Sequence, residues 1–256
     1  MIKYLIIGPG AMGFFIYLGA LSKLDLSQLE EISGASAGAI LSLLFLATRG
    51  DIPAMLDFSI KIPVKQMMKP NLKNFLTNYG LVPPTKLTVQ IKKIFKKFLK
   101  KDDVTFHELY EWNPVKLHVS AFCVDLQKTM YFSVDNTPDM SVAEAVTASV
   151  CVPFLMSSVK IGEWRYVDGA MHECMPGLPF IGKTFENIFS LTIQHNPNSK
   201  VKDLKSYAFS ILTSLSTLRH KYEFKGNQLS YDKFDIFNFS YESEDKLRMF
   251  MLGCQR

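Results

Sequence analysis

The sequence predicts an α/β fold in which a mostly parallel central sheet is sandwiched between helices. Short apolar runs alternate along the chain with longer helical patterns, an order typical of parallel sheets. The first two apolar runs each lead through glycine into a second apolar stretch, as strand–turn–helix units require. With 256 residues, 48% of them hydrophobic and 21% charged, the chain can bury the core of one large domain, and it contains no recognisable linker.

Each expected strand is a short run of apolar or β-branched residues bounded by turn residues. In chain order the expected strands are 3–7, 29–33, 116–123, 129–134, 163–167, 187–194 and 234–239. The expected helices follow from apolar periodicity and capping residues. Thr105, with Glu108 three positions later, has the pattern of a capping box at the start of one of them. The first expected helix begins near residue 11. The others cover 37–48, the first part of 51–84, the lysine-rich stretch, 105–112, 142–149, 202–225 and 244–252.

The net charge of +5 is distributed unevenly. Residues 61–101 contain 11 lysines and no acid, which leaves 18 basic and 24 acidic residues elsewhere. Within this stretch one helical face is apolar and the other is basic, a pattern typical of a membrane-surface helix or of a solvated helix that covers the core. A nucleic-acid partner is not expected, because the stretch lacks arginine and no nucleic-acid module surrounds it. The residues predicted to contact an anionic membrane are Lys92, Lys93, Lys96 and Lys97.

The four cysteines are scattered, with no CxxC pair and no histidine at ligand spacing, so we expect neither a metal site nor a disulfide framework. Residues 4–22 and 32–48 carry no charge and are nearly long enough to span a bilayer. Glycine interrupts both stretches, and we interpret each as a strand, a turn and a helix. No secretory signal is recognisable, and we expect a cytoplasmic protein that associates peripherally with membranes.

The stretch Gly34-Ala35-Ser36-Ala37-Gly38 has the Gly-x-Ser-x-Gly pattern of a nucleophile elbow. In such an elbow a serine lies on a sharp strand-to-helix turn, and small neighbours leave its hydroxyl exposed. A serine at a helix N-terminus is suited to acyl transfer. The alternative for this motif alone is a set of small residues that lets a helix pack closely on a sheet.

A second glycine turn, Gly8-Pro9-Gly10-Ala11-Met12-Gly13, matches the G-x-G-x-x-G fingerprint of dinucleotide-binding proteins. That fingerprint requires an acid at the end of the second strand, where this chain has Gly34 and Ser36. The position therefore argues against a dinucleotide. The same turn offers backbone N–H groups to an anion, including a transient oxyanion.

Two further blocks, 148–154 (ASVCVPF) and 166–170 (YVDGA), follow in order. Together the four motifs resemble the patatin-like phospholipase family, acyl hydrolases with a Ser–Asp dyad, and the resemblance covers roughly residues 2–176. It implies a patatin-like three-layer α/β/α domain over 1–256. Within that domain we expect a lysine-rich insertion or lid around 61–101 and a C-terminal extension at 200–256.

The resemblance further implies that Ser36 is the nucleophile and Asp168 the base, with an oxyanion hole formed around Gly8, Gly10 and Ala11. The expected substrate is a phospholipid or another fatty-acyl ester at an anionic membrane, and no cofactor or metal is expected. Three departures bear on activity. Pro9 has no N–H to donate, Met12 stands where the family prefers a cation, and Cys174-Met175-Pro176 replaces the family's asparagine before proline.

Two alternatives remain open at this point. The first is a catalytically impaired membrane-binding module, which Pro9, Met12 and the lysine-rich helix favour. The second is a Ser-His-Asp esterase that uses His195, which follows the expected strand 187–194.

Overall fold

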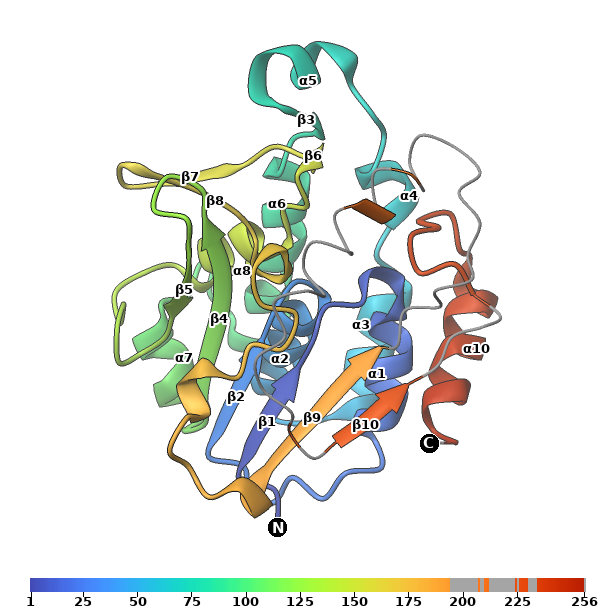
Figure 1. Ribbon diagram of the computed structural model, residues 1–256. Helices are drawn as coiled ribbons and strands as arrows, with labels where there is room; N and C mark the ends of the chain where they lie inside the picture. Colours follow the sequence, from blue (N-terminus) through green and yellow to red (C-terminus); the bar gives the residue numbers. More distant parts are fainter. Residues whose placement is uncertain (194–206, 208–209, 212–223, 225, 230–233, 256) are drawn as a thin grey trace.

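The computed structural model describes residues 1–193, 207, 210–211, 224, 226–229 and 234–255. Its main sheet contains β1 (Tyr4–Ile7), β2 (Glu31–Gly34), β4 (Lys116–Cys123), β5 (Lys128–Phe132), β7 (Val159–Ile161), β8 (Trp164–Asp168), β9 (Ile188–Ile193) and β10 (Gly226–Leu229). The strands follow the order β10-β9-β1-β2-β4-β8-β7, and β5 pairs with β4 (Figure 1). β10, β9, β1, β2 and β4 run parallel, whereas β5, β8 and β7 are antiparallel to their neighbours. The mostly parallel sheet is therefore confirmed.

The core forms because β1 is buried on both faces. Leu5 and Ile7 join the large cluster that the helices cover, whereas Tyr4 and Ile6 pack on the other face against Phe180. In Figure 1 helix α2 (Ala37–Thr48) lies behind β1 and β2, and α1 (Phe14–Leu21) lies behind the end of β9. The helix predicted over 202–225 falls almost entirely outside the described residues. The helices that flank the sheet are α1 (Phe14–Leu21), α2 (Ala37–Thr48), α3 (Ile52–Ile60), α6 (Thr85–Ile94), α7 (Phe106–Trp112), α8 (Val142–Val150) and α10 (Ser243–Gly253).

The described part of the C-terminal region packs against the rest of the fold. β10 extends the main sheet beside β9, and α10 packs along α1 with Met249 fully buried. The expected lysine-rich helix is α6, which continues into a π-helical turn over Phe95–Leu99. Its predicted apolar face is buried at Ile91, Ile94 and Phe95. In the part of the chain that the structure describes, we find no helix with the length and apolar character needed to cross a bilayer.

Two expectations need correction. The connection after α3 is more regular than predicted. It contains α4 (Val64–Met67), α5 (Leu72–Asn78) and β3 (Gly80–Val82), and β3 pairs in parallel with β6 (Phe154–Met156).

The strand predicted over 234–239 is also wrong, because this segment forms turns. The side chain of Asp235 accepts the N–H of Phe237 (2.9 Å), and that of Asn238 accepts the N–H of Ser240 (3.1 Å). Such local bonds favour turns over a sheet ladder. Ile236 is nevertheless buried, and its carbonyl accepts the N–H of Met12 (2.9 Å).

Candidate active site

Ser36 lies in the sharp turn between β2 and α2, with backbone angles φ 55° and ψ −122°. A non-glycine residue at positive φ is strained, as expected of a nucleophile elbow. The flanking glycines are required by space. A Cβ on Gly38 would lie 2.1 Å from the carbonyl oxygen of Ile7, and one on Gly34 would lie 2.6 Å from the carbonyl oxygen of Gly38. The predicted elbow geometry is therefore present in the chain.

Asp168 ends β8 and is only 1% exposed. Burial disfavours its charged form and raises the pKa of its carboxyl from 3.8 to about 7. Hydrogen bonding with the Ser36 hydroxyl opposes this rise, as does the Ala170 N–H, which donates to Oδ1 at 2.9 Å. A carboxylate with a pKa near neutrality, in contact with a serine hydroxyl, has the properties of a general base.

The glycine turn contributes fewer donors than expected. Gly8 is not available, because its N–H donates to the carbonyl oxygen of Leu191 at 2.9 Å and so continues the sheet. Pro9 has no N–H, and its carbonyl accepts the Tyr17 hydroxyl (2.8 Å). Within the described chain, the N–H groups of Gly10 and Ala11 donate to no acceptor. These two groups remain as candidate oxyanion donors.

The N–H of Ala37, at the first position of α2, is likewise without an acceptor among the described residues. Ala11, Ser36 and Ala37 line the same cavity, so two of the three candidate donor residues lie in the same lining as Ser36. A helix N-terminus also favours negative charge.

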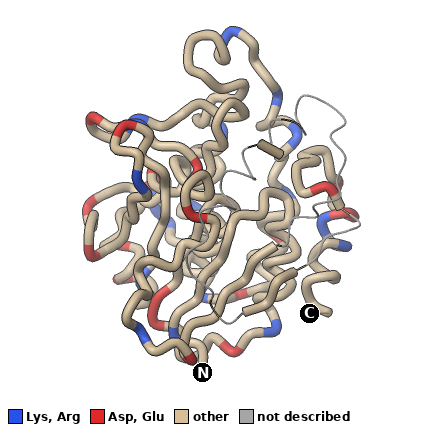
Figure 2. The backbone as a smooth tube through the Cα atoms, in the orientation of Figure 1, with Lys and Arg blue, Asp and Glu red and all other residues tan. Residues whose placement is uncertain are grey.

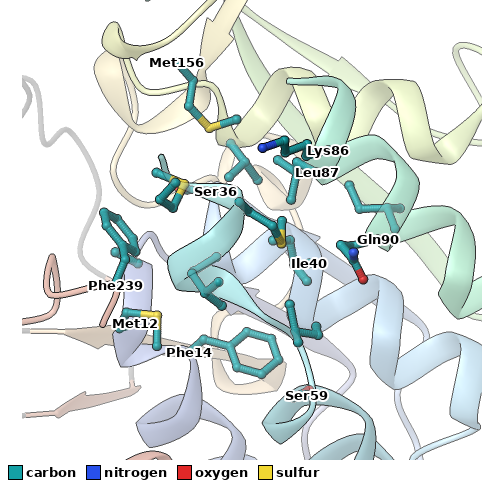
Figure 3. Close-up of a pocket in the computed structure, with 18 of the residues that line it drawn as sticks. Met12, Phe14, Ser36, Ile40, Ser59, Lys86, Leu87, Gln90, Met156 and Phe239 are labelled. Atoms are coloured by element: carbon teal, nitrogen blue, oxygen red, sulfur yellow. The ribbon is translucent and has the colours of Figure 1, made fainter. Parts of the chain in front are cut away.

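This cavity has a volume of about 160 Å³ and is almost wholly apolar. Figure 3 shows Ser36 among side chains of the glycine turn, α2, α6 and β6, with Ser59, Lys86 and Gln90 as further polar members. An apolar cavity beside a reactive polar group suits an acyl chain. The labelled apolar lining residues are Met12, Phe14, Ile40, Leu87, Met156 and Phe239.

Ser149 and Cys151 support the site but were not singled out from sequence. Ser149 Oγ accepts the N–H of Ser36 (3.0 Å), and the carbonyl of Cys151 accepts the N–H of Asp168 (2.9 Å). Burial and the nearby Asp168 charge raise the pKa of the Cys151 thiol, so this cysteine stays protonated. Both lie in the 148–154 block, which stands out in the sequence only as one of the motifs that resemble the family.

The lysines predicted to contact a membrane are largely paired with acids that lie just outside 61–101. Lys92 pairs with Asp103 (2.6 Å), Lys96 with Asp102 (3.7 Å) and Lys97 with Asp57 (3.3 Å). Lys93 has no acidic partner among the described residues. Much of the charge on this helix is therefore balanced locally.

The histidines have varied surroundings. His118 contacts Glu31 (2.8 Å), and Glu31, at the start of β2, also pairs with Lys183. His172 contacts Thr129 (2.8 Å) and stacks on a phenylalanine ring. His195 of the triad alternative lies outside the described residues. In the described part of the chain, no three His, Cys, Asp or Glu side chains are grouped as a metal would need.

A model of the patatin-like phospholipases matches residues 5–181, more than half of the chain. The chain belongs to the patatin-like phospholipase family. The matched region includes the Gly8–Gly13 turn, the Ser36 elbow and Asp168.

Individual relatives are distant. The chain is 26% identical over 176 residues to the uncharacterized protein R571 of Acanthamoeba polyphaga mimivirus, covering 66% of this chain and 58% of that one. It is 23% identical over 273 residues to the probable lipid hydrolase 463L of Invertebrate iridescent virus 6, covering 99% and 87%. The structure of VipD from Legionella pneumophila matches with a TM-score of 0.67 and 15% identity, over 99% of this chain and 65% of VipD. This last likeness supports the patatin-like fold.

Proposed function

We propose that this patatin-like protein is a lipid acyl hydrolase of the phospholipase A type, acting on fatty-acyl esters through Ser36 and Asp168. The observation that carries the proposal is the strained turn at Ser36 beside an apolar cavity, with a buried Asp168 carboxyl whose pKa the Ser36 hydroxyl lowers. Membership of the family supports the substrate class, as does the likeness to a probable lipid hydrolase.

In the proposed reaction, Ser36 Oγ attacks the ester carbonyl while Asp168 takes the hydroxyl proton. The oxyanion of the tetrahedral intermediate is held by the N–H groups of Gly10 and Ala11, with that of Ala37 nearby. The intermediate collapses, and the alcohol leaves with the proton from Asp168. A water molecule then attacks the acyl-enzyme while Asp168 accepts its proton. Asp168 gives that proton to Ser36 Oγ as the fatty acid leaves, which restores both side chains. All these steps use only side chains and backbone N–H groups of the chain.

The test is fatty-acid release from phospholipid vesicles and short-chain esters, with a chelator present. We expect release by the parent protein and a loss of at least about a thousandfold in Ser36→Ala and Asp168→Asn. Ser42→Ala is the matched control, since Ser42 is a buried serine on the same helix, outside the cavity lining, with no partner for its Oγ in the described structure. A fluorophosphonate probe followed by mass spectrometry should label Ser36 in the parent.

A folded parent that releases no fatty acid from any lipid or ester would contradict the proposal and favour the membrane-binding module. Full activity in either Ser36→Ala or Asp168→Asn would show that another residue performs that role.

A further inference from the structure

An exposed apolar surface lies at the end of the molecule formed by α5, β3 and β6, which we call the α5 tip. Its side chains are far more exposed than apolar residues need be: Leu72 69%, Leu76 74%, Tyr79 70% and Phe154 57%. Figure 1 shows α5 projecting beyond the rest of the fold. Clustered exposed apolar side chains of this kind mark an interaction site.

The tip is held in this exposed arrangement by specific contacts. Asn74 Nδ2 donates to the carbonyl of Gly80 (2.5 Å) and to Ser157 Oγ (2.9 Å), which fixes α5 to the β3–β6 pair. Tyr79 and Phe154 have positive φ angles of 59° and 66°, which bulky residues rarely adopt. Two exposed aromatic residues of the tip therefore have a disfavoured backbone conformation. Such strain often occurs at functional sites.

The charge around the tip has one sign. Residues 58–101 contain no acid, and Lys65, Lys69 and Lys73 have no acidic partner among the described residues. In Figure 2 the tube through α5 carries blue and no red. By contrast, Lys92 of α6 and both Lys96 and Lys97 of the π-helical turn after it are paired with acids. The α5 tip thus combines apolar side chains with uncompensated positive charge, the two features that bind a protein to an anionic membrane.

The tip is also continuous with the proposed acyl cavity. The chain enters α5 from Met68 and leaves it through β3 to Val82, and both residues line the cavity. The β6 partner of Val82 is Met156, a third lining residue. A lipid surface against the tip would therefore lie beside residues that form the cavity wall.

We propose that the α5 tip is the membrane-docking surface, with Leu72, Leu76, Tyr79 and Phe154 inserted among the lipids and the lysines against anionic headgroups. Delivery of lipid to Ser36 rests on the proposed function, but docking itself can be measured without turnover. This assignment shifts the main membrane contact from Lys92, Lys93, Lys96 and Lys97 to the neighbouring end of the same lysine-rich region.

The test measures cosedimentation of the Ser36→Ala protein with vesicles of phosphatidylcholine containing a minority of phosphatidylglycerol. Lys69→Gln with Lys73→Gln should weaken binding by about fivefold per lysine, since each cation near an anionic surface contributes that much. Leu72→Ser with Leu76→Ser should weaken it by at least about tenfold, because several CH₂ groups lose their burial in lipid. The matched control, Lys92→Gln with Lys96→Gln, removes the same charge from α6 and the π-helical turn after it, and should change binding by less than about twofold.

The result that would overturn the proposal is unchanged binding in the leucine pair, or an equal loss in the α6 control. A change of oligomeric state in the leucine pair, with vesicle binding retained, would assign the tip to a second copy of the chain and also overturn it. With Ser36 intact, hydrolysis of a water-soluble short-chain ester separates the two proposals. The tip variants should keep that rate. If the parent has no esterase activity, the proposed function fails, but vesicle binding still tests the docking proposal.

Discussion

Replacing Asp168 with asparagine should abolish activity and at the same time stabilise the protein at alkaline pH. The pKa of this carboxyl is about 7 in the folded protein, against an ordinary value of 3.8. Between these values the folded protein keeps the proton that the unfolded chain has lost, so stability falls as pH rises from about 4 to about 7. At about 1.4 kcal/mol per pH unit, the loss reaches about 4 kcal/mol above pH 7.

The asparagine side chain removes this cost because it never ionises. Its carbonyl oxygen can still accept the Ala170 N–H, and the amide can still bond Ser36. The free energy of unfolding in urea, followed by tryptophan fluorescence, should therefore favour Asp168→Asn over the parent by up to about 4 kcal/mol at pH 8. Near pH 4 the two proteins should be almost equally stable.

The matched control is Asp139→Asn, which makes the same substitution in an exposed turn. It should not reproduce the stabilisation that is expected of Asp168→Asn. In the parent, hydrolysis should rise with pH through about 7 and then level off as Asp168 ionises. A stability difference of the same size at pH 4 and pH 8 would refute the reasoning, because it would show that ionisation of Asp168 carries no cost.

The packing around the elbow gives two further predictions. Gly38→Ala should lower the free energy of unfolding by about 3 kcal/mol or more in urea titrations, because the new Cβ would collide with the carbonyl of Ile7. In the comparison variant Gly162→Ala the new Cβ would meet nothing within 4 Å, so only the backbone strain at φ +59° should lower stability, by about 1 kcal/mol. An equal cost at both glycines would contradict the packing argument. Ser149→Ala should cost about 1–3 kcal/mol of stability and reduce kcat, because the buried N–H of Ser36 loses its acceptor. Unchanged kcat would show that this bond does not position the nucleophile.

Local signals in the sequence predicted most of the elements around the site. The expected helix 37–48 and strand 116–123 coincide with α2 and β4, and the capping box of Thr105 and Glu108 is formed. Each depends on residues close in sequence, such as apolar periodicity or a cap three positions away. The same locality explains why the elbow glycines could be recognised, since the spacing of the motif is itself the steric requirement.

Long-range contacts were beyond such reasoning. The pairing of β3 with β6 joins segments about seventy residues apart. Both strands are too short to show the alternating apolar pattern from which a strand is predicted. The charge of the lysine-rich stretch was also misleading, because the acids that balance it at Asp57, Asp102 and Asp103 lie just beyond its ends. The role of Ser149 could not be predicted either, because its hydroxyl accepts the N–H of Ser36 only once the fold brings the two residues together.

The two strained regions of the molecule differ in how they are held. Ser36 stands between β2 and α2, whose residues are nearly all buried, so opening the elbow would require disruption of the central core. Tyr79 and Phe154 are strained at an exposed tip that depends on a few hydrogen bonds, chiefly those of Asn74. We infer that the elbow is rigid and preorganised, and that opening the tip would cost less free energy than opening the elbow. The proposed nucleophile is thus the part of the site that the core holds most firmly, as preorganised catalysis requires.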